Sequence, residues 1–264
     1  MTLLEKIYDL APEQSQILQT EFVDDQLIEV REFENYRWLQ IGGDSIQGLM
    51  DVNSPSQILL PNIQALLTTL LVCPEPRQLL NLGFGCGSIE RFCIDRLSDV
   101  EITSLETSES VIQLAKEFFF IGVGEGCQII NTSAEVFLDN EKKAYDIILC
   151  DIFNDEEHPA CLYDATFYKN LDNCLDDKGV LAINLLPESE DDVLDILLSM
   201  KNYFDNISLL EVPNHFNAIL FASNSRLPEA AELETRANKC LNQTGLDLSD
   251  LPQRLNRLME MMPV

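Results

Sequence analysis

The sequence predicts an α/β protein with a mostly parallel sheet that ends in an antiparallel hairpin, preceded by a small N-terminal β-hairpin unit. From Pro61 to Ser223, short apolar runs alternate with amphipathic segments, which is typical of a parallel sheet covered by helices on both faces. The last two runs are joined only by residues 213–217, and this connection is too short for a parallel crossover. The first sixty residues are rich in β-formers and lack that alternation.

Residues 1–60 are expected to contain a short helix and the hairpin unit. The two strands are 27–33 and 36–41, separated by the turn-prone pair Glu34-Asn35. These segments supply the apolar side chains of a half-buried hairpin: Val30, Phe33, Trp38 and Leu39.

The main domain is expected to span residues 61–223. Its five parallel strands are short apolar runs at 78–82, 101–105, 127–130, 145–150 and 179–184. Helical periodicity falls between them, at 88–97, 109–120, 167–175 and 190–204. The closing antiparallel strands are 207–212 and 218–222, and the tail, 224–264, is expected to form two polar-faced helices separated near Gly245.

Composition limits the classes of function. The chain has 264 residues and a net charge of −28, which repels nucleic-acid backbones and can concentrate a cationic substrate. The favoured explanation of the acidity is solubility, or adaptation to salt or cold, without a ligand. No apolar run reaches the roughly eighteen residues of a membrane span, and the N-terminus does not resemble a secretion signal.

The eight cysteines are scattered and show no C-x-x-C spacing, and the chain has only two histidines. This pattern predicts reduced thiols, no metal site and a cytoplasmic protein.

A glycine-rich turn carries the clearest chemical signal. Gly83, Gly85 and Gly87 link the strand 78–82 to the next helix, so the backbone can approach a ligand closely and helix amides can point at it. Glu106 ends the following strand, nineteen residues beyond Gly87. A carboxylate there can accept hydrogen bonds from ribose hydroxyls. Alternatively, it interacts with the N-terminus of the helix after it.

Asp151 ends the apolar strand 145–150 and precedes a polar loop. Open α/β sheets bind ligands at the carboxyl ends of their strands, so Asp151 is the candidate catalytic residue. The alternative is a helix cap. A dinucleotide oxidoreductase would share the turn and the acid, but the G-x-G-x-G spacing and the terminal hairpin argue against it.

The segments LLNLGFGCGSIERF, VEITSLETSESVIQLAKEFF, YDIILCDIFND and FYKNLDNCLDDKGVLAINLL resemble the spermidine-synthase superfamily. The likeness covers about residues 26–222 and is closest to a bacterial branch labelled spermidine-synthase-like or SAM-dependent methyltransferase. It implies a Rossmann-like methyltransferase fold behind an N-terminal β-hairpin unit, and a homodimer.

The resemblance also implies a binding site for S-adenosylmethionine (SAM) or decarboxylated SAM. Its residues would be Gln47 of the pair Ile46-Gln47, Gly83, Gly85, Gly87, Glu106, and Ser133 with Ala134 near the adenine. Asp151 matches the first aspartate of the catalytic D-x-x-D loop of aminopropyltransferases.

The chain departs from true aminopropyltransferases at several positions. Cys86 replaces the aspartate that helps to hold the aminopropyl ammonium of the donor, and Ser133 replaces the aspartate near the adenine. Asn154 replaces the second loop aspartate, although Asp155 is adjacent. Residues 51–57 replace the family's D-E-x-x-Y-H stretch.

These departures favour a SAM-dependent transferase of a methyl group, acting on a small acceptor for which the acidity suits a cation. Methyl transfer requires fewer carboxylates than holding a diamine. Two alternatives stay open: a polyamine aminopropyltransferase that uses decarboxylated SAM, and a non-catalytic nucleoside-binding or regulatory protein.

Overall fold

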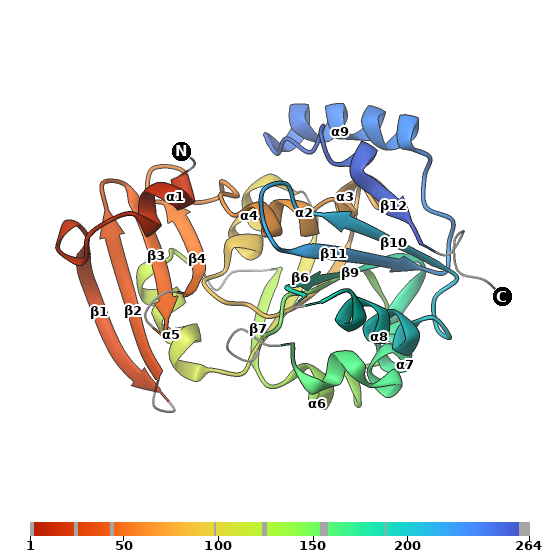
Figure 1. Ribbon diagram of the computed structural model, residues 1–264, viewed down its shortest axis with the longest axis horizontal. Helices are drawn as coiled ribbons and strands as arrows, with labels where there is room; N and C mark the ends of the chain where they lie inside the picture. The colour runs from red at the N-terminus through yellow and green to blue at the C-terminus, as the bar shows by residue number, and fades with distance from the viewer. Residues whose placement is uncertain are drawn as a thin grey trace.

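The structure is a computed structural model that describes residues 3–23, 26–42, 45–97, 99–122, 126–153, 158–187 and 189–258. The described strands form two sheets, which lie side by side (Figure 1). One is a four-stranded antiparallel sheet in the order β1 (Gln16–Val23), β2 (Gln26–Phe33), β3 (Tyr36–Ile41) and β4 (Ser45–Asp51). The other has eight strands in the order β12 (Leu255–Arg257), β10 (Asn206–Glu211), β11 (Ala218–Ser223), β9 (Leu175–Leu185), β8 (Tyr145–Cys150), β5 (Gln78–Leu82), β6 (Glu101–Glu106) and β7 (Cys127–Asn131). Within the described residues, no helix is both long and apolar enough to cross a membrane.

The N-terminal sheet is larger than the predicted hairpin unit. The predicted strands are present as β2 (Gln26–Phe33) and β3 (Tyr36–Ile41), and they are flanked by β1 (Gln16–Val23) and β4 (Ser45–Asp51). The sequence did not reveal β1 because half of its residues are polar, and β4 contains Gly48, which weakens a strand pattern. A short helix, α1 (Leu3–Tyr8), precedes the sheet, followed by a 3-10 turn, Pro12–Gln14.

The large sheet has the predicted parallel centre, with β5 (Gln78–Leu82), β6 (Glu101–Glu106), β7 (Cys127–Asn131), β8 (Tyr145–Cys150) and β9 (Leu175–Leu185). The predicted antiparallel hairpin is also confirmed: β11 (Ala218–Ser223) pairs with both β9 and β10 (Asn206–Glu211). Its central strands are apolar on both sides because helices cover both faces.

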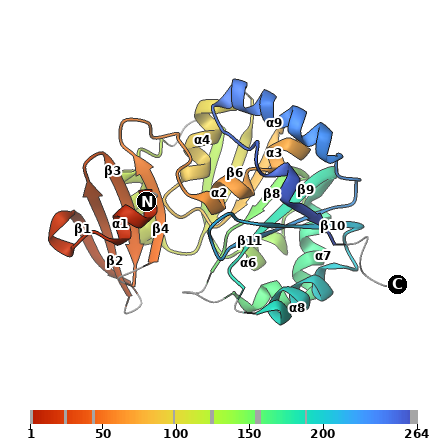
Figure 2. The same ribbon diagram turned by 45° about the horizontal axis from the view of Figure 1, so that its top comes forward.

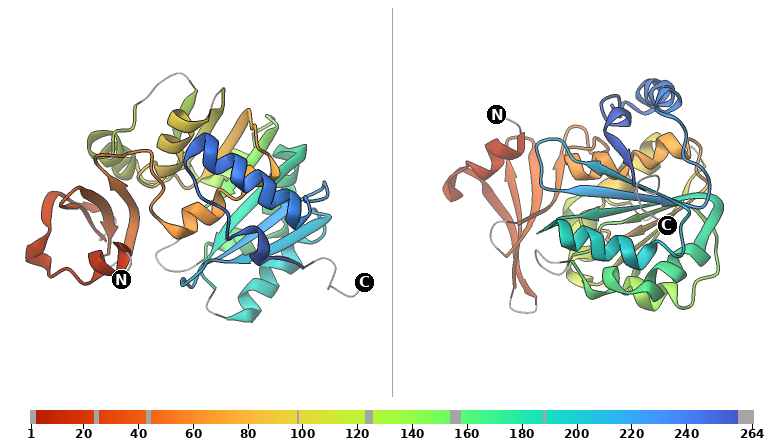
Figure 3. Two further views of the ribbon diagram at one scale, coloured as in Figure 1. Left: turned by 90° about the horizontal axis from the view of Figure 1, so that it is seen from above. Right: turned by 45° about the vertical axis from the view of Figure 1, so that its right-hand side comes forward.

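Helices cover the two faces of the large sheet, as Figures 2 and 3 show. One face carries α2 (Pro61–Leu66), α3 (Thr69–Val72), α4 (Ser88–Arg96) and α9 (Ala230–Thr244). The other carries the 3-10 turn Ala160–Tyr163, α6 (Ala134–Leu138), α7 (Ala165–Cys174) and α8 (Glu190–Met200). The helix α5 (Glu109–Phe118) packs through Val111 and Leu114 on Ile28 and Val30 of the N-terminal sheet.

The tail differs from the prediction of two helices. The first is α9, which ends at Gly245 with a left-handed φ of 77°. The prediction of a second helix is wrong: the described residues after α9 form a 3-10 turn, Pro252–Arg254, and the strand β12 (Leu255–Arg257), which pairs antiparallel with β10. Pro252 disfavours a continuous helix, and the new strand satisfies backbone groups at the edge of β10. Residues 259–264 lie outside the described residues.

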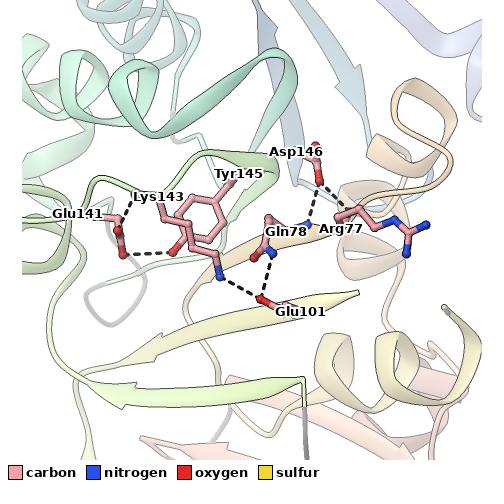
Figure 4. A network of polar contacts seen from close by, with 7 residues as sticks. All are labelled: Arg77, Gln78, Glu101, Glu141, Lys143, Tyr145 and Asp146. Atoms are coloured by element: carbon pink, nitrogen blue, oxygen red, sulfur yellow. Dashed lines mark hydrogen bonds and ion pairs between the residues drawn. The ribbon is translucent and has the colours of Figure 1, made fainter. Parts of the chain in front are cut away.

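A polar network joins β5, β6 and β8 at their amino ends (Figure 4). Asp146 Oδ2 accepts hydrogen bonds from the backbone amides of Arg77 and Gln78 at 2.7 and 2.9 Å. Gln78 Nε2 donates to Glu101 Oε2 at 3.0 Å, and Lys143 pairs with the same oxygen at 3.4 Å. This network connects the starts of the three strands, at the edge opposite to their carboxyl ends.

Candidate functional site

The glycine turn lies at the carboxyl edge of the large sheet, between β5 and α4. The amides of Gly83 and Phe84 donate to the carbonyl of Leu105 on β6 at 3.1 and 2.9 Å. Gly83 has a φ of 100°, and a Cβ there would overlap the backbone carbonyl of Asp151. Only glycine therefore allows this turn to lie against the end of β8.

Gly87 ends the turn and is the N-cap of α4, with a φ of 74°. A Cβ at Gly87 would overlap the side chain of Ile121, so this position also excludes larger residues. All three predicted glycines have a left-handed φ, which is 100° at Gly83, 53° at Gly85 and 74° at Gly87, and they lie in the turn ahead of the helix.

The N-terminal sheet lies against the glycine turn. A Cβ built on Gly85 would lie 3.5 Å from the carbonyl oxygen of Gln47 on β4, and one on Gly48 would overlap the thiol of Cys86. Gln47 is exposed, and Cys86 is buried with 2% of its surface accessible. The candidate residue Gln47 is therefore next to the turn, and the Cys86 side chain packs against β4.

Glu106 contacts the turn directly. Its Oε2 accepts a hydrogen bond from the Gly85 amide at 3.2 Å, and its Oε1 accepts one from the Ser108 amide at 3.0 Å. Because Ser108 caps α5, the carboxylate also lies at a helix N-terminus, as the alternative interpretation expected. The Thr107 hydroxyl also donates to Oε1, in a long hydrogen bond of 3.4 Å. An ionised carboxylate has about four acceptor positions, so one position, and the one held by this long bond, are available to ribose hydroxyls.

Ser133 and Ala134 lie one strand further along the same edge. Residue Glu106 pairs in register with Asn131 on β7, whose Nδ2 donates to the Glu106 carbonyl at 2.9 Å. The Ser133 hydroxyl accepts a hydrogen bond from the Val136 amide at 3.4 Å and so caps α6. Ala134 is buried at the start of that helix.

Asp151 follows β8, and its amide donates to the Leu82 carbonyl at 2.7 Å. Its Oδ1 accepts a hydrogen bond from Asn184 Nδ2 at 2.7 Å, and Asn184 Oδ1 accepts one from Asn217 Nδ2 at 3.1 Å. Burial raises the pKa of the Asp151 carboxyl, and the bond from Asn184 partly opposes this. The helix-cap interpretation is wrong, since the side chain bonds to β9 and Asp164 caps α7.

His158 holds the far end of the segment after Asp151. Its Nε2 accepts a hydrogen bond from the Leu186 amide at 2.8 Å, and its Nδ1 lies 3.3 Å from the Tyr163 hydroxyl. The bond from the Leu186 amide connects His158 to the chain directly after β9, close to Asn184 in the sequence. The loop residues Asn154 and Asp155 lie outside the described residues.

Sequence reasoning missed the asparagines that organise the site. Asn184 ends an otherwise apolar strand, which is the same signal that identified Asp151. Asn131 and Asn217 could not have been identified, because asparagine is ordinary near turns.

All eight cysteines are free thiols, and the cytoplasmic location stays a prediction. Within the described residues, no cluster of side chains could hold a metal ion.

Comparisons with known proteins agree with this geometry. Residues 67–226 match the model of the spermine/spermidine synthase domain. A polyamine aminopropyltransferase from Chromobacterium violaceum is 25% identical over 235 residues, which cover 87% of this chain and 89% of the relative.

Two solved structures share the fold. A probable spermidine synthase from Corynebacterium glutamicum has a TM-score of 0.75 at 16% identity, covering 92% of this chain and 91% of its own. Human methyltransferase-like protein 13, in complex with SAH, has a TM-score of 0.60 at 20% identity, covering 70% and 88%. The predicted fold class and the family resemblance are thereby confirmed.

Proposed function

Because this chain belongs to the spermine/spermidine synthase domain family, we propose that it is a polyamine aminopropyltransferase, which moves the aminopropyl group of decarboxylated SAM to a small amine. The observation that carries the proposal is the partly buried Asp151 carboxylate at the carboxyl edge, held by Asn184 beside the glycine turn. The relative from C. violaceum, which matches most of the chain, supports the same reaction. The proposal reverses the order of the two transfer reactions that the sequence favoured.

The donor side of the site fits a nucleoside. Gly83 and Gly85 adopt left-handed backbone conformations in the turn, and Glu106 keeps acceptor capacity beside Gly85. Gln47 lies at the wall formed by β4. In this proposal Glu106 binds the ribose hydroxyls, and Ser133 and Ala134 lie on the adenine side.

Asp151 would act on the acceptor amine. The amine must lose a proton as its lone pair attacks the carbon attached to the sulfonium, while the carbon–sulfur bond breaks and its electron pair goes to sulfur. Asp151 can attract the ammonium form and accept that proton. Its raised pKa makes it a stronger base than an exposed aspartate. The charge of −28 would also raise the local concentration of a polyamine.

Methyl transfer from SAM is the second candidate, and the buried Cys86 thiol favours it. Cys86 occupies the position at which the aminopropyltransferases that this chain resembles carry an aspartate. Its buried side chain packs against Gly48. A thiol there cannot pair with the aminopropyl ammonium of the donor. Methyl transfer needs no such pair.

Calorimetric titration with decarboxylated SAM, SAM and methylthioadenosine, followed by a transfer assay with putrescine, separates the candidates. We expect decarboxylated SAM to bind at least as tightly as SAM. We also expect the reaction of decarboxylated SAM with putrescine to release methylthioadenosine. A clear preference for SAM without aminopropyl transfer would favour the methyltransferase. Nucleoside binding without transfer of either group would favour a non-catalytic nucleoside-binding protein, and no binding of any of the three nucleosides would favour a regulatory protein. The homodimer implied by the family remains a proposal that sedimentation can test.

A further inference from the structure

A fully buried acidic side chain lies beneath the glycine turn. Glu90, in the first turn of α4, has no exposed surface. Its Oε1 accepts hydrogen bonds from Asn81 Nδ2 at 2.7 Å and from Ser104 Oγ at 2.5 Å. Asn81 and Ser104 are paired in register on β5 and β6 and are equally inaccessible. We call these three residues the Glu90 cluster.

The cluster is connected to the turn through Asn81. The same Nδ2 group that donates to Glu90 also donates to the carbonyl of Gly83 at 3.2 Å. Because Nδ2 has two acceptors, the orientation of the Asn81 amide is determined. One side chain therefore links Glu90 to the carbonyl of the first glycine of the candidate donor site.

The surroundings of Glu90 do not favour a negative charge. No ion pair joins it to a cation in the part of the chain that the structure describes. The neighbouring Arg91 guanidinium bonds to the carbonyls of Pro55, Cys86 and Phe119 instead. A buried carboxylate without a cation takes up a proton. Burial raises the pKa of Glu90, opposed by the bonds from Ser104 and Asn81 and by the charge of Arg91.

The other titratable groups near Glu90 are thiols. The pKa values of Cys93 and Cys127 are raised, mainly by burial and also by the proximity of Glu90. Both thiols are therefore uncharged at neutral pH, and neither offers a positive charge.

Two unpartnered oxygens give an independent reason for a proton. Glu90 Oε2 and Asn81 Oδ1 are buried and have no hydrogen-bond partner among the described residues. A carboxylic acid and a primary amide form a ring of two hydrogen bonds: amide N–H to acid C=O, and acid O–H to amide C=O. The first bond is present between Asn81 and Glu90. The second bond would join Glu90 Oε2 to Asn81 Oδ1, the two oxygens that lack partners, and it needs a hydrogen on Oε2.

We infer that Glu90 is an uncharged carboxylic acid at neutral pH and that, through Asn81, it fixes the carbonyl of Gly83, which makes Glu90 a positioning residue of the donor-binding turn. The positioning role rests on the proposed function, because it assumes that the turn binds a nucleoside. The protonation does not, since it follows from the fold.

Carbon-13 NMR of protein labelled at the glutamate carboxyl tests the protonation. The Glu90 resonance is the one absent from Glu90→Gln. We expect it at the position of an uncharged acid from mildly acidic to mildly alkaline pH. A resonance at the carboxylate position at neutral pH would overturn the inference.

Binding of methylthioadenosine, measured by calorimetry, tests the positioning. Glu90→Gln can keep both bonds of the ring, because its amide donates to Asn81 Oδ1 and its carbonyl accepts, so we expect affinity within about twofold of the wild type. Glu90→Met has similar length without polar atoms, so we expect an affinity loss of about tenfold. The amide resonances of Gly83 and Gly85 should shift in Glu90→Met and much less in Glu90→Gln.

Ser223→Ala is the matched control, because it removes a buried hydrogen bond from Ser223 Oγ to the Gly179 carbonyl at 2.8 Å, away from the turn. It should reduce stability and leave nucleoside affinity and the Gly83 resonance unchanged. Equal losses of affinity in Ser223→Ala and Glu90→Met would refute a positioning role. If the wild type binds no nucleoside, the proposed function fails, and the carboxyl and Gly83 resonances still decide the inference.

Discussion

Replacing Asn184 with leucine is expected to shift the pH dependence of the proposed aminopropyl transfer. Asn184 Nδ2 donates to Asp151 Oδ1 at 2.7 Å, and such a bond is stronger when the carboxyl is ionised. A hydrogen bond to a charged group contributes about 1.5–3 kcal/mol, which corresponds to about one to two pKa units. Burial already raises the pKa of Asp151, and this bond opposes the rise. Asn184→Leu should therefore raise the pKa further.

The direction of the effect follows from the role of the base. Asp151 must be ionised to accept a proton, so the acid limb of the rate profile should move to higher pH by about one unit or more. Single-turnover rates with decarboxylated SAM and putrescine across pH would measure this. Asn217→Leu should cause a smaller shift in the same direction, because Asn217 only orients Asn184.

The control is Asn224→Leu, since the Asn224 amide bonds to Asp172 on the protein surface at 2.6 Å. Its profile should match that of the wild type. An unmoved acid limb in a folded, active Asn184→Leu, or an equal shift in Asn224→Leu, would refute the reasoning.

Three further predictions concern single side chains. Asp151→Asn should reduce turnover by about 10²–10⁴-fold with donor affinity unchanged; a normal turnover number would exclude Asp151 as the base. Glu106→Ala should weaken methylthioadenosine binding by about 1.5–3 kcal/mol in calorimetry, and unchanged affinity in the folded variant would contradict the ribose contact. Glu90 keeps its proton in the folded state and loses it in the unfolded state above a pH of about 4.3, so wild-type stability should fall by about 1.4 kcal/mol per pH unit relative to Glu90→Gln. Urea unfolding measures this difference, and free energies of unfolding that change equally with pH in the two proteins would disprove it.

The large sheet could be predicted from sequence because its strands are apolar on both sides and bounded by turn formers. Predicted and observed limits of the strand at Tyr145–Cys150 agree, and the helix after Gly87 ends within one residue of its prediction. The strand β9 begins four residues earlier than expected, at Leu175. Leu175 pairs with Tyr145 and Val180 pairs with Ile147, so the polar residues Asp176 and Asp177 lie in an irregularity between these pairs, which the sequence pattern does not reveal.

The N-terminal sheet and the tail could not be predicted as well, because tertiary contacts decide them. Half of the residues of strand β1 are exposed, and the strand gains its place by pairing with β2. The residues of β12 have no strand pattern of their own. At the site, glycine and strand-end acids could be found from spacing, whereas the contact between Gly48 and Cys86 joins two segments that only the fold brings together.

The strand β12 also determines how the sheet meets other molecules. A bare β10 would present unpaired amides and carbonyls along its border, and such borders recruit strands from other chains. With only the three residues Leu255–Arg257, the tail covers part of that border. Proteolytic trimming of the tail would thus lengthen the unpaired border of β10 that is open to intermolecular β-pairing, without touching a residue of the donor site.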